Sequence, residues 1–215
     1  MARTPALLIA MAVGLTAVAL VAVLGWQPAP VEPAARALPT PVLAAGVAVT
    51  PPAALPDFSL RDQRGKPFTP VDLQGHWSLI LPGFTHCPDI CPATLAILDR
   101  VHDLLGSTAA ELQVVLLSVD PQRDTPEALA RYLAFFNPGF VGVTGDQEQL
   151  ERAYQGLGVQ HIRIPGTRGE YSVDHSAALL LIDPESRLVG YFMPPFRAER
   201  LAVDLGPLLT NLYHR

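Results

Sequence analysis

The 215-residue sequence contains few charged residues, three methionines and only two cysteines. Charged side chains make up 16% of the chain, well below the roughly 25% of a typical soluble domain, which suggests that part of the chain lies in lipid. The basic residues are scattered and the net charge is −5, so a nucleic-acid-binding protein is disfavoured. Two cysteines allow at most one disulfide bond and exclude a disulfide framework. Because Met1 and Met11 lie at the N-terminus, a methionine-rich metal site is excluded as well.

Residues 6–26 form an uncharged apolar run of 21 residues, which is the length that spans about 30 Å of hydrocarbon as a helix. Arg3 and the amino terminus place positive charge before this run, so residues 1–5 are expected in the cytoplasm. A cleaved signal peptide is the alternative, but its apolar core usually has only about 7–15 residues. The pattern therefore favours an uncleaved single-pass anchor in a bacterial inner membrane, with the rest of the chain in the periplasm.

Residues 27–56 are rich in proline and alanine and show neither helical nor strand periodicity. Such a composition predicts an extended tether that reaches up to about 3.1 Å per residue. A domain on this tether could search the membrane surface near its anchor, which suits a client that is itself a membrane protein.

From residue 57 to 215 the hydrophobic pattern indicates one folded α/β domain. The predicted elements are a β-hairpin around Arg64–Gly65, strands at 77–84, 112–119, 140–143, 171–182 and 188–192, and helices at 92–105, 126–136, 146–157 and 197–212. A parallel βαβ core that is followed by an antiparallel hairpin and a closing helix is typical of a thioredoxin-like domain. Here it carries an extra N-terminal β-hairpin.

The two cysteines, Cys87 and Cys91, lie between a predicted strand and the start of a predicted helix. A helix N-terminus favours the thiolate and lowers a cysteine pKa. Three intervening residues place both sulfur atoms on one side of a helical turn, where they could form a distorted disulfide or chelate one soft cation such as Cu(I) or zinc. The alternative is a pair of buried structural cysteines. His86 is expected to be exposed or to lie outside the coordination sphere.

A trigonal Cu(I) site needs a third ligand, and His175 is the best candidate among the histidines. It directly precedes an apolar strand segment, 177–182, whose start should face the cysteine helix in a thioredoxin-like sheet. Thiol oxidoreductases of this fold usually carry a cis-proline at that place, so a histidine favours a metal site. A hydrogen-bonded core histidine is the alternative. The remaining histidines are assigned to strands, a helix or the terminus: His76, His102, His161 and His214.

Other polar or soft side chains near these motifs allow two interpretations. Asp120 ends a predicted strand, while Asp124 precedes the predicted helix N-cap Thr125. With Arg123, these carboxylates could instead contact a client or tune the cysteine site. Met193 is a candidate accessory ligand, although its place at the end of a strand explains it equally well.

The segments 85–92, 118–126 and 171–176, in this order, resemble the Sco/SenC family of copper-binding assembly proteins. The resemblance extends over roughly residues 55–213. It implies that Cys87, Cys91 and His175 bind one copper ion, as Cu(I), Cu(II) or both. Phe84 stands where a tyrosine would be expected in this family, and the loop at 165–170 is short and glycine-rich.

The resemblance further implies a metallochaperone that delivers copper to the copper A site of cytochrome c oxidase subunit II or reduces the cysteines of that site. A thiol–disulfide oxidoreductase that acts on periplasmic client cysteines is the alternative, in which one cysteine attacks and the other resolves the mixed disulfide. The sequence leaves open whether the chain acts as an enzyme. Another periplasmic copper chaperone or a thiol reductase is a further candidate partner. A peroxidase is disfavoured, since Thr85 lies two positions before Cys87 rather than three.

Overall fold

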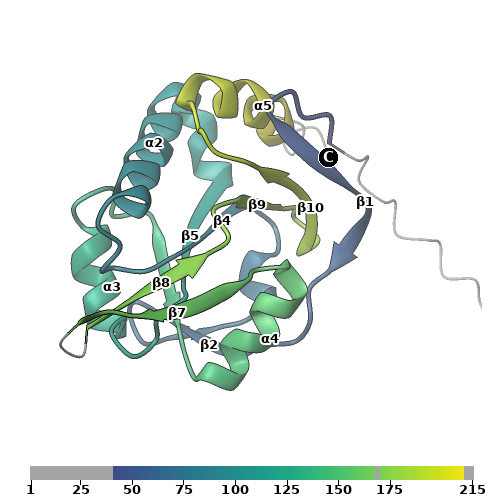
Figure 1. Cartoon of the computed structure of the whole chain (residues 1–215). Coiled ribbons are helices and arrows are strands. Elements are labelled where there is room, and N and C mark those ends of the chain that lie inside the picture. The colour runs from purple at the N-terminus through teal and green to yellow at the C-terminus, as the bar shows by residue number, and fades with distance from the viewer. Residues whose placement is uncertain (1–40, 168–169, 211–215) are drawn as a thin grey trace, which may run out of the picture. The chain divides into compact units, whose positions relative to one another are not determined.

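The computed structural model describes residues 41–167 and 170–210 (Figure 1). The predicted membrane anchor at 6–26 and the first part of the predicted tether, 27–40, lie outside these residues. Within the part that is described, no helix combines the length and the apolar character that crossing a membrane requires.

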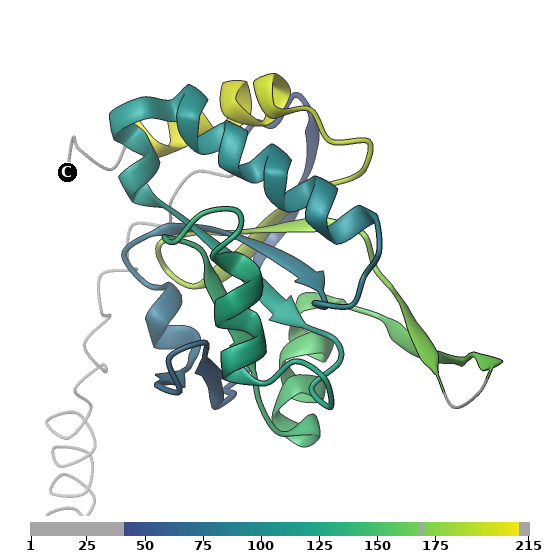
Figure 2. The ribbon, with the colours of Figure 1, turned by 90° about the vertical axis from the view of Figure 1, so that its left-hand side faces the viewer.

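The described residues form one large mixed sheet and one small ribbon. The strand order in the eight-stranded sheet is β1 (Gly46–Ala54), β10 (Arg187–Phe192), β9 (Leu179–Ile182), β4 (Trp77–Gly83), β5 (Leu112–Ser118), β6 (Val141–Thr144), β2 (Leu60–Asp62) and β3 (Pro67–Phe68). Neighbouring strands β4, β5 and β6 are parallel, and the other pairs are antiparallel. Strands β7 (His161–Pro165) and β8 (Tyr171–His175) pair only with each other, and Figure 2 shows this ribbon projecting from the body.

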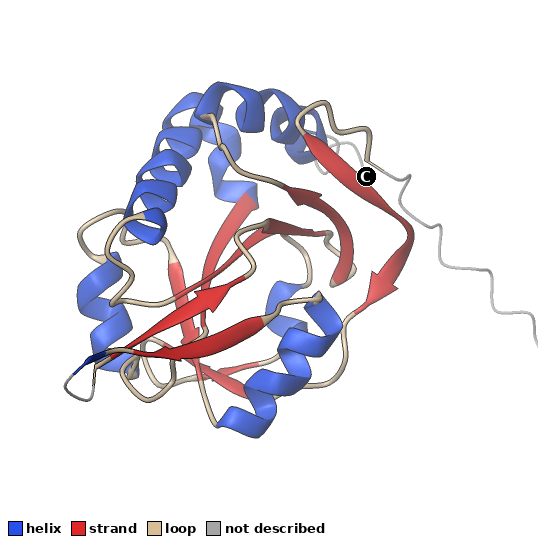
Figure 3. Ribbon diagram, in the orientation of Figure 1, coloured by secondary structure: helices blue, strands red, loops and turns tan. Residues whose placement is uncertain are grey.

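Helices cover both faces of the large sheet (Figure 3). The helices and 3₁₀ segments are η1 (Pro70–Leu73), α2 (Ile90–Leu105), η2 (Gly106–Glu111), α3 (Pro126–Leu133), α4 (Gln147–Leu157) and α5 (Ala198–Thr210). The apolar sides of α2, α3 and α5 pack on one face of the sheet, and that of α4 packs on the other. Residues of β5 alternate between these two cores, so the strand is apolar on both sides, as the run at 112–119 predicts.

Local signals mark several of the helix ends. The Thr125 hydroxyl accepts a hydrogen bond from the Ala128 N–H at 3.2 Å, so Thr125 is the N-cap of α3. Helices α2 and α4 end at Gly106 and Gly158, whose φ angles of 58° and 67° suit glycine. Helix α3 ends at Leu133, three residues earlier than predicted, because the chain turns ahead of the Asn137–Pro138 step.

The prediction of a tether up to residue 56 is wrong for its last part, which forms strand β1 and pairs with β10. Its two adjacent prolines, Pro51 and Pro52, lie in the stretch where the pairing register shifts, and β1 is an edge strand of the sheet. Edge strands and bulges are the places where a sheet tolerates proline. The Asp204 carboxylate on α5 fixes the entry to this strand by accepting the N–H groups of Ala44 and Ala45 at 2.9 and 2.7 Å.

The predicted single strand at 171–182 is also wrong, because the chain forms β8 in the ribbon and then β9 in the large sheet. Residues of β8 are mostly accessible, whereas all four residues of β9 are buried. The change occurs just after Ser176, whose N–H donates to the Gln160 carbonyl at 2.9 Å and closes the ribbon. His175 therefore lies at the end of a ribbon and not within a core strand.

Removal of β1 should destabilise the domain measurably. We expect a fragment of residues 56–215 to lose at least about 2 kcal/mol of unfolding free energy relative to 41–215, because apolar contacts of β1 and the partners of buried Asp204 are removed. Urea denaturation of both fragments measures the difference, and equal midpoints would contradict the integral role of β1.

Candidate metal centre

The chain turns from β4 into α2 through the segment 84–89, and this turn carries Cys87. The Cys87 N–H donates to the Phe84 carbonyl at 3.2 Å, and the Cys91 N–H donates to the Cys87 sulfur at 3.4 Å. Asp89, the N-cap residue of α2, makes no side-chain cap, so Cys87 Sγ satisfies a first-turn N–H group in its place. Both cysteines are free thiols; Cys87 is half-buried and Cys91 is fully buried.

His175 at the end of β8 meets the buried cysteine. Its Nε2 atom lies 4.0 Å from Cys91 Sγ, and its Nδ1 atom lies 2.9 Å from the Ser176 carbonyl oxygen. A carbonyl oxygen only accepts, so Nδ1 is the donor in this hydrogen bond, and Nε2 is the ring nitrogen that faces Cys91. The Phe84 ring packs edge-on against the imidazole, with 5.9 Å between ring centroids. His175 is thus held with Nε2 facing the Cys91 sulfur.

The 4.0 Å between His175 Nε2 and Cys91 Sγ suits two ligands of one ion. Donor atoms at about 2.0 and 2.3 Å from a metal and about 120° apart lie about 3.7 Å from each other. Within 41–167 and 170–210, however, no three His, Cys, Asp or Glu side chains already surround a common metal position. Binding by Cys87, Cys91 and His175 together therefore requires a local side-chain adjustment.

Burial changes the chemistry of Cys91. Desolvation is the main cause that raises the pKa of its thiol to about 12, and the nearby Cys87 and Asp124 add to the shift, although a backbone hydrogen bond with Phe84 opposes it. The predicted lowering by the helix N-terminus is therefore wrong for Cys91. At neutral pH this thiol is protonated unless a metal ion displaces the proton.

Gly83, the last residue of β4, makes room for the buried sulfur. A Cβ atom at this position would lie 3.0 Å from Cys91 Sγ and 2.9 Å from Leu116 Cδ1. Both separations are shorter than normal van der Waals contact, so a side chain here would have to displace the Cys91 sulfur or the end of the Leu116 side chain. The strand end thus fixes one wall of the site.

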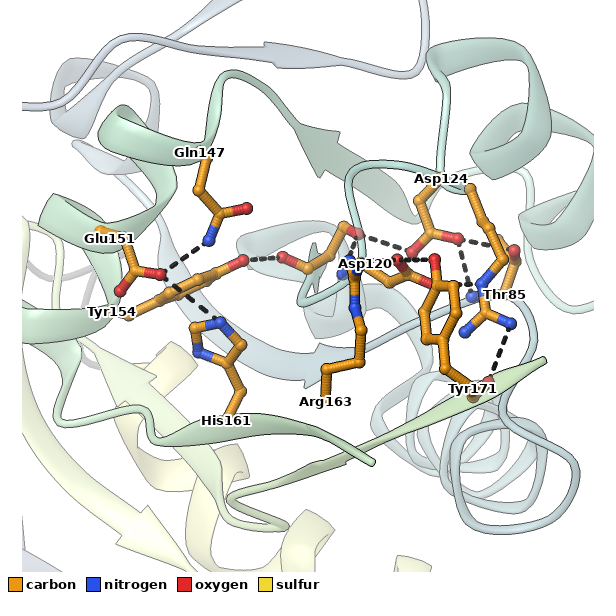
Figure 4. Close-up of polar contacts among 11 residues, drawn as sticks. Thr85, Asp120, Asp124, Gln147, Glu151, Tyr154, His161, Arg163 and Tyr171 are labelled. Atoms are coloured by element: carbon orange, nitrogen blue, oxygen red, sulfur yellow. Dashed lines mark hydrogen bonds and ion pairs between the residues drawn. The ribbon is translucent and has the colours of Figure 1, made fainter. Parts of the chain in front are cut away.

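Asp124 links the cysteine turn to the end of β5 (Figure 4). Its carboxylate accepts hydrogen bonds from the Thr85 N–H at 3.1 Å, the Thr85 hydroxyl at 2.6 Å and the Ser118 hydroxyl at 2.6 Å. Burial raises the pKa of Asp124, while these hydrogen bonds counteract the shift. Since Thr125 provides the helix cap, Asp124 instead holds the backbone that leads to Cys87. Of the two sequence interpretations of Asp124, this contact favours the one in which it acts on the cysteine site over the one in which it belongs to a helix cap.

The other candidate ligands lie apart from the Cys91–His175 contact or have other partners. His86 is exposed and its Nδ1 lies 3.0 Å from the Thr85 hydroxyl. His102 packs edge-on against Phe140, and burial lowers its pKa. His161 lies 3.5 Å from Glu151 and packs against a tyrosine ring of α4. Met193 is 58% exposed after the end of β10. His214 lies outside the described residues.

Comparison with known proteins reveals extensive similarity. The family model described as SCO1/SenC matches residues 48–210. A Stutzerimonas stutzeri protein, provisionally named as copper-binding, is 41% identical over 159 residues, which are 74% of this chain and 78% of that protein.

Two solved structures extend this similarity to three dimensions. The copper-bound structure of Bradyrhizobium japonicum ScoI has a TM-score of 0.68 and 35% identity, covering 72% of this chain and 99% of that one. Copper-bound yeast Sco1 has a TM-score of 0.67 and 31% identity, and the match covers 74% of this chain and 90% of that one. These likenesses confirm the predicted α/β, thioredoxin-like fold.

The two thiols should differ strongly in reactivity. We expect iodoacetamide at pH 8 to modify half-buried Cys87 at least about 100-fold faster than Cys91, because a pKa of about 12 leaves about one Cys91 in 10⁴ ionised. Mass spectrometry of the alkylated peptides measures both rates, with Cys87→Ser and Cys91→Ser as matched single-thiol controls. Comparable rates at the two positions in the folded protein would contradict the burial of Cys91.

Proposed function

This chain belongs to the SCO1/SenC family, and on that premise we propose that it binds one copper ion through Cys87, Cys91 and His175. The observation that carries the proposal is the 4.0 Å approach of His175 Nε2 to Cys91 Sγ. Two thiolates and a neutral imidazole are soft to borderline donors, which suit Cu(I). The copper-bound relatives ScoI and Sco1 support the same cargo.

The three donors contribute differently to copper handling. Cys91 is buried and excludes water from one side of the ion, whereas Cys87 is partly accessible to a second protein. His175 is oriented by its hydrogen bond to the Ser176 carbonyl, which engages Nδ1 and leaves Nε2 to coordinate. An incoming thiolate from a client can approach on the Cys87 side and replace the ligands one at a time.

We propose that the client is the copper A site of cytochrome c oxidase subunit II, as the family resemblance implies. We also propose that residues 6–26 anchor the domain in a bacterial inner membrane with the metal centre in the periplasm. The uncharged 21-residue run supports this placement. A membrane-bound client and a membrane-anchored chaperone would then meet by diffusing in the plane of the same membrane.

Thiol–disulfide exchange is the second candidate function, and the short Cys91 N–H to Cys87 Sγ contact favours it. In this reaction the Cys87 thiolate attacks a client disulfide and releases one client thiolate; Cys91 then attacks Cys87, releases the second client thiol and leaves the two cysteines oxidised. The second step needs a Cys91 thiolate, which a pKa of about 12 makes scarce at neutral pH. The burial of Cys91 and its contact with His175 therefore favour copper transfer.

Replacing His175 separates the two functions. His175→Ala should weaken Cu(I) binding at least about 100-fold, since even outer-shell losses cost about 10–100-fold, while reduction of a small disulfide should continue at a similar rate. Competition against a Cu(I) chelator under nitrogen measures the affinity, and His86→Ala is the control because His86 is exposed beside Cys87. Unchanged Cu(I) affinity in His175→Ala would refute the three-ligand site.

Copper affinity should also depend on pH. Because the pKa of Cys91 is about 12, copper must displace its proton throughout the range from pH 6 to 9, so the apparent Cu(I) affinity should rise at least about ten-fold per pH unit. Cys91→Ser should flatten this slope. A pH-independent affinity of the unmodified protein would show that Cys91 is not a thiolate ligand.

A further inference from the structure

The ribbon that carries His175 has no backbone pairing with the large sheet among the described residues. Its five residue pairs join only β7 to β8, so the ribbon moves as one piece unless side chains fix it to the body. Besides the buried Val173 of β8, which packs in the core, Figure 4 shows polar attachments in two places. One is the contact of His161 with Glu151 and Tyr154 on α4. The other lies at Tyr171, where β8 begins.

Arg123 forms the centre of the attachment at Tyr171. Its Nε donates to the fully buried Asp120 carboxylate, and its Nη1 donates to the Tyr171 carbonyl at 3.2 Å. The guanidinium carbon lies 3.9 Å from the centroid of the Tyr171 ring. The Tyr171 hydroxyl donates to the same Asp120 carboxylate at 2.8 Å. The carbonyl, the ring and the hydroxyl of Tyr171 thus all hold strand β8 to the loop after β5.

The same guanidinium also reaches the cysteine side of the site. Its carbon lies 5.7 Å from the centroid of the Phe84 ring, and that ring packs edge-on against His175. Arg123 is therefore next to Phe84, the first residue of the cysteine turn, and to the strand that ends in His175. Arg163, which also lies over the Tyr171 ring at 4.2 Å, is more exposed and 4.0 Å from Asp120.

The guanidinium is held by ring faces and not only by hydrogen bonds. Its side chain is 25% exposed, and Nη2 is buried without a hydrogen-bond partner among the residues that the structure describes. A lysine ammonium cannot reproduce a planar fork that bonds two groups while stacking on an aromatic ring. The arrangement therefore depends on arginine itself and not merely on positive charge.

We propose that Arg123 is a positioning residue for copper binding: it fixes β8 at Tyr171 so that His175 stays beside Cys91 before the metal arrives. The inference rests on the proposed function, because it concerns the third ligand of that same site. Without Arg123, the ribbon pivots about its remaining attachments and His175 spends less time in reach of the thiols. The effect of Arg123 on copper then operates through His175 alone.

A double-mutant cycle tests this directly. Arg123→Lys should weaken Cu(I) binding by about ten-fold in the otherwise unmodified chain, but by less than about two-fold when His175→Ala is already present. Tyr171→Phe, which keeps the ring and the carbonyl but removes the hydroxyl bond to Asp120, should show a smaller loss with the same dependence on His175. Arg152→Lys is the control, since Arg152 is an exposed arginine on α4.

Each outcome distinguishes this inference from the proposed function. An unmodified chain that binds no Cu(I), or that binds equally well after His175→Ala, overturns both. A large loss with His175→Ala and none with Arg123→Lys or Tyr171→Phe overturns the positioning role alone. Equal losses from Arg123→Lys in both backgrounds show a general structural role and also overturn it. Thermal unfolding of every variant confirms that the compared proteins are folded.

Discussion

The approach of the Cys91 sulfur to the His175 imidazole joins positions 84 residues apart in the chain, and the rest of the site is organised around it. The cysteine is fixed, because it lies in the first turn of α2 with the side chain in the core. The histidine is at the end of a ribbon whose backbone bonds to no other strand of the described residues. Side-chain contacts, among them those of Val173 and Tyr171, hold that ribbon against the body, so the meeting of the two side chains depends on residues outside the contact itself.

Burial gives the site its chemical character. A dry environment around Cys91 keeps the thiol protonated and slows its direct exchange with disulfides, yet a soft cation can still displace the proton. Cys87 and His175 remain partly accessible, so one side of the centre can meet another protein. This asymmetry suits a carrier better than a fast oxidoreductase, because the carrier must protect its cargo and still release it to competing ligands.

Much of the fold could be predicted from the sequence, at the places where local signals are strong. The apolar run of β5 and the glycines at 106 and 158 mark their elements without ambiguity. The proline-rich β1 looks like a spacer, because an edge strand does not need the alternation or the N–H groups of a central strand. The separation of β8 from β9 depends on long-range pairing with β7, which no local pattern records. The sequence pattern links Arg123 only to its neighbouring carboxylates, since its partner Tyr171 is 48 residues away.

X-ray absorption spectroscopy of the Cu(I)-loaded full chain reports on the ligands of the metal themselves. We expect one copper ion with two sulfur scatterers at about 2.2–2.3 Å and one nitrogen at about 2.0 Å, and the nitrogen contribution should disappear on replacement of His175. A spectrum with sulfur ligands only, or one that keeps the nitrogen contribution in the His175→Ala variant, would contradict the three-ligand site.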